Sequence, residues 1–244
     1  MEVHHHGGGH NGPKKFKEYF LECLMIFVAV TMGFLAENFR EYITEKSNVQ
    51  ELVGQLEVDL SNDSMNVQKL INFESAQVKR ADSLFEMLNQ PAKQIDYQKL
   101  QDMLVSCDRI DFFYPSTGAI TTIKRQLQLK EFVNTKLASH IDNYEKTATV
   151  VQAFENRNVE YLGKYLETFL SRHFTPENAA QAVLRRPVLN GKMRNLNPED
   201  LVQLSVDINL IKAYNLVILS RYLLVKTEAE KLIIHLNKTY DLDK

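Results

Sequence analysis

The chain has 244 residues, a formal net charge of −2 and two cysteines. Such a balance of acids and bases argues against a nucleic-acid partner, because proteins that bind nucleic acids normally carry a basic surplus. Cys23 falls in an apolar run and Cys107 in the remainder, so the remainder cannot contain an internal disulfide. We expect Cys107 to be a small buried side chain. The alternative is that it is exposed and pairs between chains.

The N-terminal tail, residues 1–15, is rich in glycine and histidine. Its histidines are His4, His5, His6 and His10. Clustered imidazoles can bind zinc, copper or nickel. The intervening glycines provide no fixed geometry, so we expect a flexible cytoplasmic tail that binds metal weakly at most. We expect no cofactor for the protein.

Residues 16–38 predict a transmembrane helix. From Cys23 to Ala36 there is no charge, and extending the run back to Phe20 gives 17 residues, the short end of a spanning helix. Basic residues precede the run and mostly acidic ones follow it: Lys14, Lys15 and Lys17 before, and Glu37, Arg40 and Glu41 after. Since basic residues favour the cytoplasmic side, we expect the N-terminus to be cytoplasmic.

Two alternatives to an anchor fit the same run. A cleaved signal peptide has this charge and apolar length. However, Phe34 breaks the small-x-small rule for cleavage after Ala36, and the helical pattern continues without a break into the next residues. A buried helix of a soluble protein is the other alternative. We favour an uncleaved membrane anchor.

The predicted span has a face of small residues. Glu22, Ala29, Gly33 and Ala36 are spaced 7, 4 and 3 apart and therefore share one side of a helix. Ala29 and Gly33 form a small-xxx-small pair, which lets two helix backbones approach closely in lipid. Glu22 either reaches the cytoplasmic interface or lies at a helix–helix contact, where it would bind a partner or a proton. We expect self-association or packing against other membrane proteins.

Residues 39–244 predict a helical domain on the far side of the membrane. Apolar residues recur at helical spacing, and no stretch alternates as a strand. The predicted fold is therefore all-α, with one N-terminal transmembrane helix continuing into a helical bundle. After a turn at 61–64 we expect helices at 64–89, 96–107, from Gly118 onward, and 134–172. Residues 174–197 read as an irregular loop with four basic residues, Arg185, Arg186, Lys192 and Arg194.

The last helix carries the clearest pattern. The sequence Asn197-Pro198-Glu199-Asp200 has a capping residue, a proline at the first helical position and acids in the first turn. A heptad seam of a bundle follows: Leu204, Ile208, Ile211, Asn215, Ile218 and Tyr222. A polar residue such as Asn215 in a seam usually fixes its register. Lys212 and Arg221 argue against a second span.

The first 60 residues resemble a family of uncharacterised single-span inner-membrane proteins abundant in Bacteroidota. The likeness lies in MEVHHH, in KKFKEYFLECLMIFVAVTMGFLAENFRE, and in an L-x-x-D-L-x-x-D pattern at Leu56, Asp59, Leu60 and Asp63. The stretch FFYPSTGAITTIKRQLQLKEFVNTKLASHIDNYEK is similar more loosely. The resemblance implies a natural His-rich tail, an uncleaved anchor in the inner membrane of a Gram-negative cell and a periplasmic helical body. It implies no activity, because the family has no assigned function.

No catalytic motif is present, including G-x-S-x-G, H-E-x-x-H and a phosphate-binding glycine loop. We therefore expect a protein that is not an enzyme. The first hypothesis is an oligomeric structural or interaction protein that scaffolds or regulates an envelope complex. The alternative is a periplasmic sensor or ligand-binding module with a pocket lined by Phe112, Phe113 and Tyr114. A third is an ion-conducting assembly around Glu22.

Overall fold

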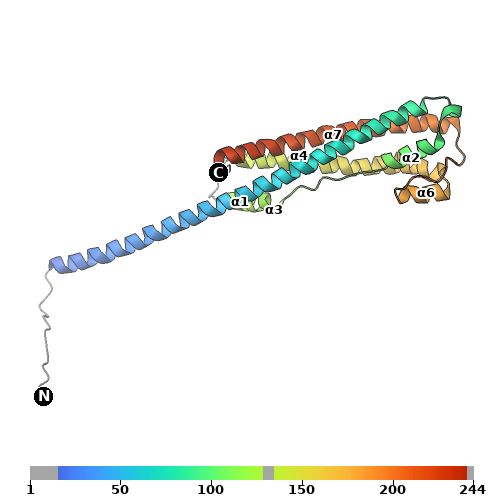
Figure 1. Cartoon of the computed structure of the whole chain (residues 1–244). Coiled ribbons are helices and arrows are strands. Elements are labelled where there is room, and N and C mark those ends of the chain that lie inside the picture. The colour runs from blue at the N-terminus through green and yellow to red at the C-terminus, as the bar shows by residue number, and fades with distance from the viewer. Residues whose placement is uncertain (1–15, 129–134, 241–244) are drawn as a thin grey trace, which may run out of the picture. The chain divides into compact units, whose positions relative to one another are not determined.

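The computed structural model describes residues 16–128 and 135–240 (Figure 1). Within these ranges the regular elements are helices, and the pairing of Phe174 with Met193 is an isolated β-bridge. The predicted all-α fold is confirmed. The chain divides between Glu51 and Leu52 into two compact units, and the second of these is called the body below. Residues 39–51, predicted to belong to the periplasmic domain, fall in the first unit.

The first helix is longer than the sequence predicted. α1 runs from Phe16 to Leu88 without interruption, so the predicted turn at 61–64 is wrong. Two features explain this. Leu60 and Val67 are both buried and continue one apolar stripe through the region. Asp63, which looked like a turn residue, is itself buried and accepts hydrogen bonds from other parts of the body. Tertiary contacts thus outweigh the local turn preference of Ser, Asn and Asp.

Three long helices form the body (Figure 1). They are the part of α1 from Leu52 onward, α4 (Thr135–Tyr161) and α7 (Pro198–Tyr240). Side-chain pairs join them: Tyr144 of α4 donates to Asp63 of α1, and Lys226 of α7 donates to Gln68 of α1 at 2.7 Å. Their facing sides supply most of the buried apolar residues, as ridges of one helix fill grooves of the next.

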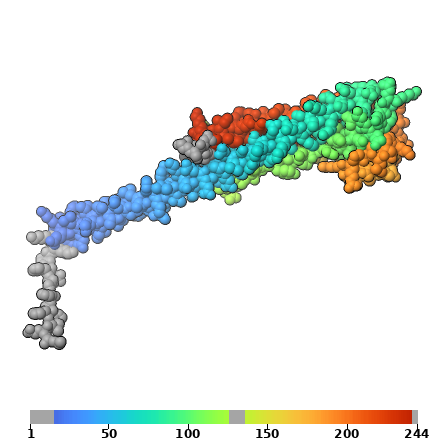
Figure 2. All heavy atoms as spheres, viewed as in Figure 1, coloured from blue at the N-terminus to red at the C-terminus, as the bar shows by residue number. Residues whose placement is uncertain are grey.

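The predicted seam of α7 is buried along its whole length. Every one of its members is in the core: Leu204, Ile208, Ile211, Asn215, Ile218 and Tyr222. Asn158 of α4 donates to Asn215 at 3.4 Å, so the polar seam position has a polar partner. α7 begins at Pro198 with acids in its first turn, as predicted, and the Asp200 carboxylate accepts from the Asn197 backbone N–H at 2.8 Å. The opposite side of α7 lies on the surface of the body (Figure 2).

Short elements connect the long ones. They are η1 (Ala92–Gln94), α2 (Tyr97–Cys107), α3 (Gly118–Gln128), the π-helical turn η2 (Leu162–Glu167), α5 (Thr168–His173) and α6 (Pro176–Val183). The helices predicted near 96–107 and from Gly118 correspond to α2 and α3. α2 and α6 lie together at one end of the body, where Asn178 of α6 donates to Gln101 of α2 at 2.9 Å (Figure 1).

α6 corrects the prediction of an irregular stretch at 174–197. The Thr175 hydroxyl caps the helix by accepting from the Asn178 N–H at 3.3 Å, and Pro176 occupies the first turn. This is the same capping pattern that predicted α7, so a helix signal was present in the sequence and was missed. The rest of the stretch is held by buried Asn178, whose side chain bonds the backbone of Leu189 and Asn190.

A proline at position 62 tests whether residues 61–64 lie within a helix. Asn62 is exposed, so its side chain contributes little. We expect Asn62→Pro to lower the free energy of unfolding by ~3 kcal/mol or more, because proline removes a helical hydrogen bond and clashes with the preceding turn. Asn62→Ala is the control and should be neutral or slightly stabilising. Denaturant unfolding followed by circular dichroism measures both effects. If the proline is tolerated, residues 61–64 form a turn and not part of a helix.

Candidate functional site

The first unit consists, in its described part, of an exposed apolar helix. Within α1 lies a window long and apolar enough to cross a membrane, near the N-terminus, and none of it is buried. The predicted packing face is exposed throughout: Glu22, Ala29, Gly33 and Ala36. A side chain added at Gly33 would meet no atom within 4 Å. This surface is therefore open to lipid or to another helix.

α7 also passes the length and composition test for a membrane span. A third of its apolar window is buried, however, and its seam packs in the core. Lys212 pairs with Asp82 of α1, and the Arg221 guanidinium lies 5.3 Å from the ring centre of Phe154 in α4. These contacts are those of a core helix in a bundle, which is the role that the sequence predicted for α7.

A segment without regular structure, residues 109–117, runs between α2 and α3 against the long helices. We call it the connecting segment. Phe113 in its middle is buried, whereas Asp111, Tyr114 and Thr117 are exposed. Where the segment packs against the helices, its N–H and C=O groups need partners other than a helix or a sheet. Side chains of α1, α4 and α7 bond several of them, so buried polar side chains gather along this segment.

Asp63 of α1 binds one end of the connecting segment. Its carboxylate accepts from the Ser116 backbone N–H at 2.9 Å and from the Ser116 hydroxyl at 3.0 Å. It also accepts from the Tyr144 hydroxyl of α4. Burial and the neighbouring carboxylate raise the pKa of Tyr144, so the phenol keeps its proton and remains a donor. One buried acid thus joins α1, α4 and the segment.

Glu155 of α4 binds the middle of the connecting segment. It accepts from the Phe113 N–H at 2.8 Å and from the Tyr222 hydroxyl of α7 at 2.6 Å. Burial raises the pKa of Glu155, and these two hydrogen bonds oppose that rise by favouring the charged form. Further along, the Gln77 amide of α1 donates to the Arg109 carbonyl at 3.1 Å. All three long helices therefore contribute to one polar network.

Glu74 of α1 is the exception in this network. Its side chain is 2% exposed, and its Oε2 atom has no hydrogen-bond partner in the part of the chain that is described. Burial, together with the charges of Glu155 and Asp111, raises the pKa of Glu74 to about 8. Glu74 is therefore mostly protonated at neutral pH, which avoids a second buried charge beside Glu155.

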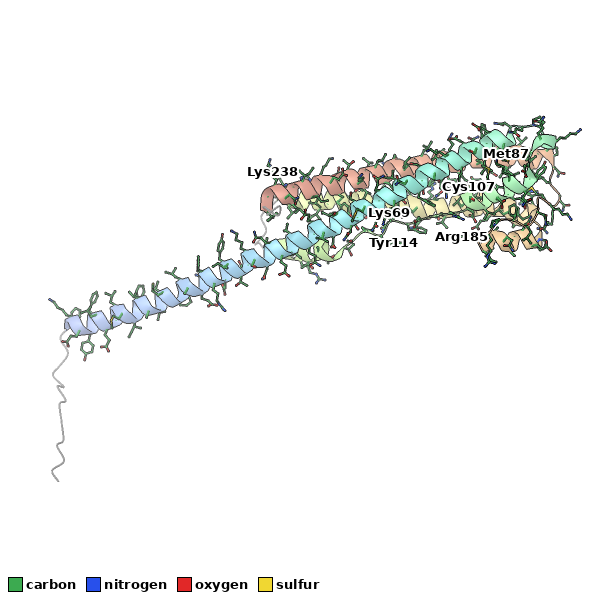
Figure 3. The ribbon with its side chains drawn as sticks, viewed as in Figure 1. Lys69, Met87, Cys107, Tyr114, Arg185 and Lys238 are labelled. Atoms are coloured by element: carbon green, nitrogen blue, oxygen red, sulfur yellow. The ribbon has the colours of Figure 1, made fainter. Side chains whose placement is uncertain are left out.

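The predicted aromatic pocket is only partly present. A hollow of about 280 Å³ is lined by Tyr114, Ser116, Tyr144, Thr149 and Gln152, with other residues of α3 and α4. Tyr114 lies at its edge on the connecting segment and is 77% exposed (Figure 3). Phe113 is instead buried in the core, and Phe112 does not line the hollow. The three aromatics predicted to line one pocket therefore do not do so.

Other groups that the sequence singled out lie in the body, apart from the exposed Cys23. Cys107 is buried, as predicted, and burial raises the pKa of its thiol to about 12. Arg194, one of the four basic residues in the predicted loop, binds the Phe174 and Ser171 carbonyls at 2.6 and 2.9 Å. Among residues 16–128 and 135–240, no group of three or more His, Cys, Asp or Glu side chains could hold a metal ion. His4, His5, His6 and His10 lie outside the described residues.

Comparisons of the chain with protein-family models, curated proteins and solved structures find no match. The resemblance of its first 60 residues to Bacteroidota membrane proteins therefore remains a prediction. Function must therefore be inferred from the surfaces and the interior of the chain itself. Its interior places buried acids where they bind backbone and tyrosine groups, and its first unit exposes an apolar helix.

The raised pKa of Glu74 makes stability depend on pH in a defined direction. An unfolded chain releases this proton near 4.5, whereas the folded chain retains it to about 8. Stability should therefore fall as the pH rises through that window, by roughly 5 kcal/mol at most. Glu74→Gln removes the titrating group. We therefore expect the change that it causes in the free energy of unfolding to be more stabilising at pH 9 than at pH 5.

Denaturant unfolding at the two pH values measures the difference. Glu86→Gln, at an exposed position of the same helix, is the matched control and should have the same small effect at both. An equal effect of Glu74→Gln at pH 5 and pH 9 would show that Glu74 does not titrate as proposed.

Proposed function

We propose that this protein is a membrane-anchored structural or interaction protein that acts as an oligomer and scaffolds or regulates an envelope complex. The observation that carries the proposal is the contrast between its two units. The body buries its own apolar core, whereas the apolar window of α1 has no residue buried. An apolar helix of this length needs lipid or a partner to cover it, because exposed apolar patches of such size are rare on soluble monomers.

The flanking charges support an orientation. Basic residues before the window and acids after it favour a cytoplasmic N-terminus and a periplasmic body. In an inner membrane this places the tail, residues 1–15, in the cytoplasm.

The face of Ala29, Gly33 and Ala36 supports association within the membrane. Helices in lipid gain no hydrophobic energy by meeting, so small residues that allow close van der Waals packing mark their contacts. The open space at Gly33 fits this role, because a second helix could approach its backbone directly. Glu22 shares this side of the helix and would lie at or near the contact.

The interior of the body supports a structural role. Asp63 and Glu155 are the acids best placed for chemistry, but each is engaged by a backbone N–H and a tyrosine hydroxyl. A general acid or base must instead reach a substrate. The hollow beside Tyr114 favours ligand binding as a second candidate function. It is the weaker candidate, because the Tyr144 hydroxyl near it is already bound to Asp63.

Leucine at Gly33 tests association through the span. We expect the full-length protein in mild detergent to form a defined oligomer, and Gly33→Leu to raise its dissociation constant about ten-fold by separating the two backbones. Thr31→Leu is the matched control, because Thr31 lies on the other side of the helix and is equally exposed to solvent. Light scattering coupled to chromatography gives the masses. A monomeric parent protein, or an equal effect of both variants, would count against the proposal.

A further inference from the structure

α7 has a second apolar face, on the side away from its buried seam. Its members from Val202 to Leu224 are exposed: Val202, Val206, Leu210, Ala213, Leu216, Val217, Ser220, Leu223 and Leu224. The apolar side chains larger than alanine are between 36% and 67% exposed. We call this set the outer α7 face. Part of α7, in orange to red, is visible on the surface of the body in Figure 2.

The outer α7 face carries no charge, although the helix does. Between positions 202 and 224 the charged residues are Asp207, Lys212 and Arg221. Asp207 is buried and accepts from Gln203 at 2.9 Å. Lys212 pairs with Asp82 of α1, and Arg221 lies over the ring of Phe154 in α4. Every charge in the stretch is therefore directed to the body, which leaves an uninterrupted neutral surface facing outward.

The spacing along this face is that of a helix–helix seam. Val206, Leu210, Ala213, Val217, Ser220 and Leu224 are separated by 4, 3, 4, 3 and 4 residues. Such alternation keeps one stripe facing a partner helix over several turns. A helix that only closed the bundle would need the buried seam alone and would carry polar residues on its outer side. The second stripe requires a second partner.

We propose that the outer α7 face is an interface with the same face of a second copy of this chain. A symmetric interface must be self-complementary. Ala213 and Ser220 are small and alternate with Leu210, Val217 and Leu224, so the large side chains of one copy fit over the small ones of the other. Because the face is neutral, pairing brings no like charges together, and an acidic or basic partner would gain nothing from it.

The exposed area is of the right size. Seven half-exposed valine and leucine side chains present on the order of 500 Å², the upper part of the range for the largest patch on a monomer. Two such faces would bury about 1,000 Å² together, the lower limit for a specific interface. The inference rests on the proposed function in one respect, since a shared membrane brings two copies together, but it uses a different surface from the span.

Cysteine cross-linking in membranes containing the full-length protein tests this interface. The background is Cys23→Ser, since Cys107 is buried and its raised pKa keeps it unreactive. Ala213→Cys and Ser220→Cys are each oxidised alone, and then together after co-expression of the two variants. A disulfide between two copies of one variant reports parallel pairing of the α7 helices. A disulfide between the two different variants reports antiparallel pairing. We expect most of the protein to become a disulfide-linked dimer in at least one of these. Ala153→Cys and Ser83→Cys, exposed on α4 and α1, are matched controls and should stay monomeric.

Two further variants give the test its specificity. Val217→Glu should reduce the dimer yield at least five-fold, whereas Val159→Glu, at an exposed valine of α4, should not. Adding Gly33→Leu should leave the cross-link in place, which separates this interface from the span. Cross-linking no greater than in the controls would overturn the proposal. The proposal would also be overturned if the cysteine at position 213 is protected from a water-soluble maleimide but reacts with a lipid-soluble one. That result would mean that lipid covers the face.

Discussion

The body depends on one constraint: where a segment without regular structure enters the core, its backbone groups must have hydrogen-bond partners. Residues 109–117 lie against three long helices, and Phe113 of this segment is buried. From the helices, Glu155 accepts from the Phe113 N–H, Asp63 accepts from the Ser116 N–H, and Gln77 donates to the Arg109 carbonyl. Asp63 and Glu155 also bind tyrosines of neighbouring helices, so the segment, α1, α4 and α7 are fixed together. Polar residues in this core specify an arrangement that apolar contacts alone would leave less defined.

The use of Glu155 as a buried acceptor has an electrostatic consequence for Glu74. Glu155 serves as a buried acceptor, and a second acid close to it can be accommodated only by holding a proton. The body is therefore expected to be most stable at mildly acidic pH. Asp63 and Glu155 each bind a backbone N–H of the connecting segment and a tyrosine hydroxyl, which is a structural part.

Both long terminal helices carry more apolar surface than the body uses. In α1 the surplus is the window near the N-terminus, none of which is buried. In α7 it is the outer face, which lies opposite a fully buried seam. The two surfaces differ in kind: the first has small residues suited to close packing in lipid, and the second has a heptad stripe suited to packing in water. A protein built to associate in the membrane and outside it would need both.

Periodicity alone predicted the all-α class, the N-terminal apolar helix, the seam of α7 and the start of α7, because helical spacing and capping are local properties of the sequence. It missed α6, although Thr175 and Pro176 gave the same capping signal, and it placed a turn at 61–64. Only the tertiary structure showed that Asp63 is an acceptor for Ser116 and Tyr144, residues far from it in sequence. Likewise, Phe113 could be assigned to the core and Glu74 to a site beside Glu155 only after the helices were packed. These features depend on which helix faces meet, and helical spacing shows that a face is apolar without showing what lies against it.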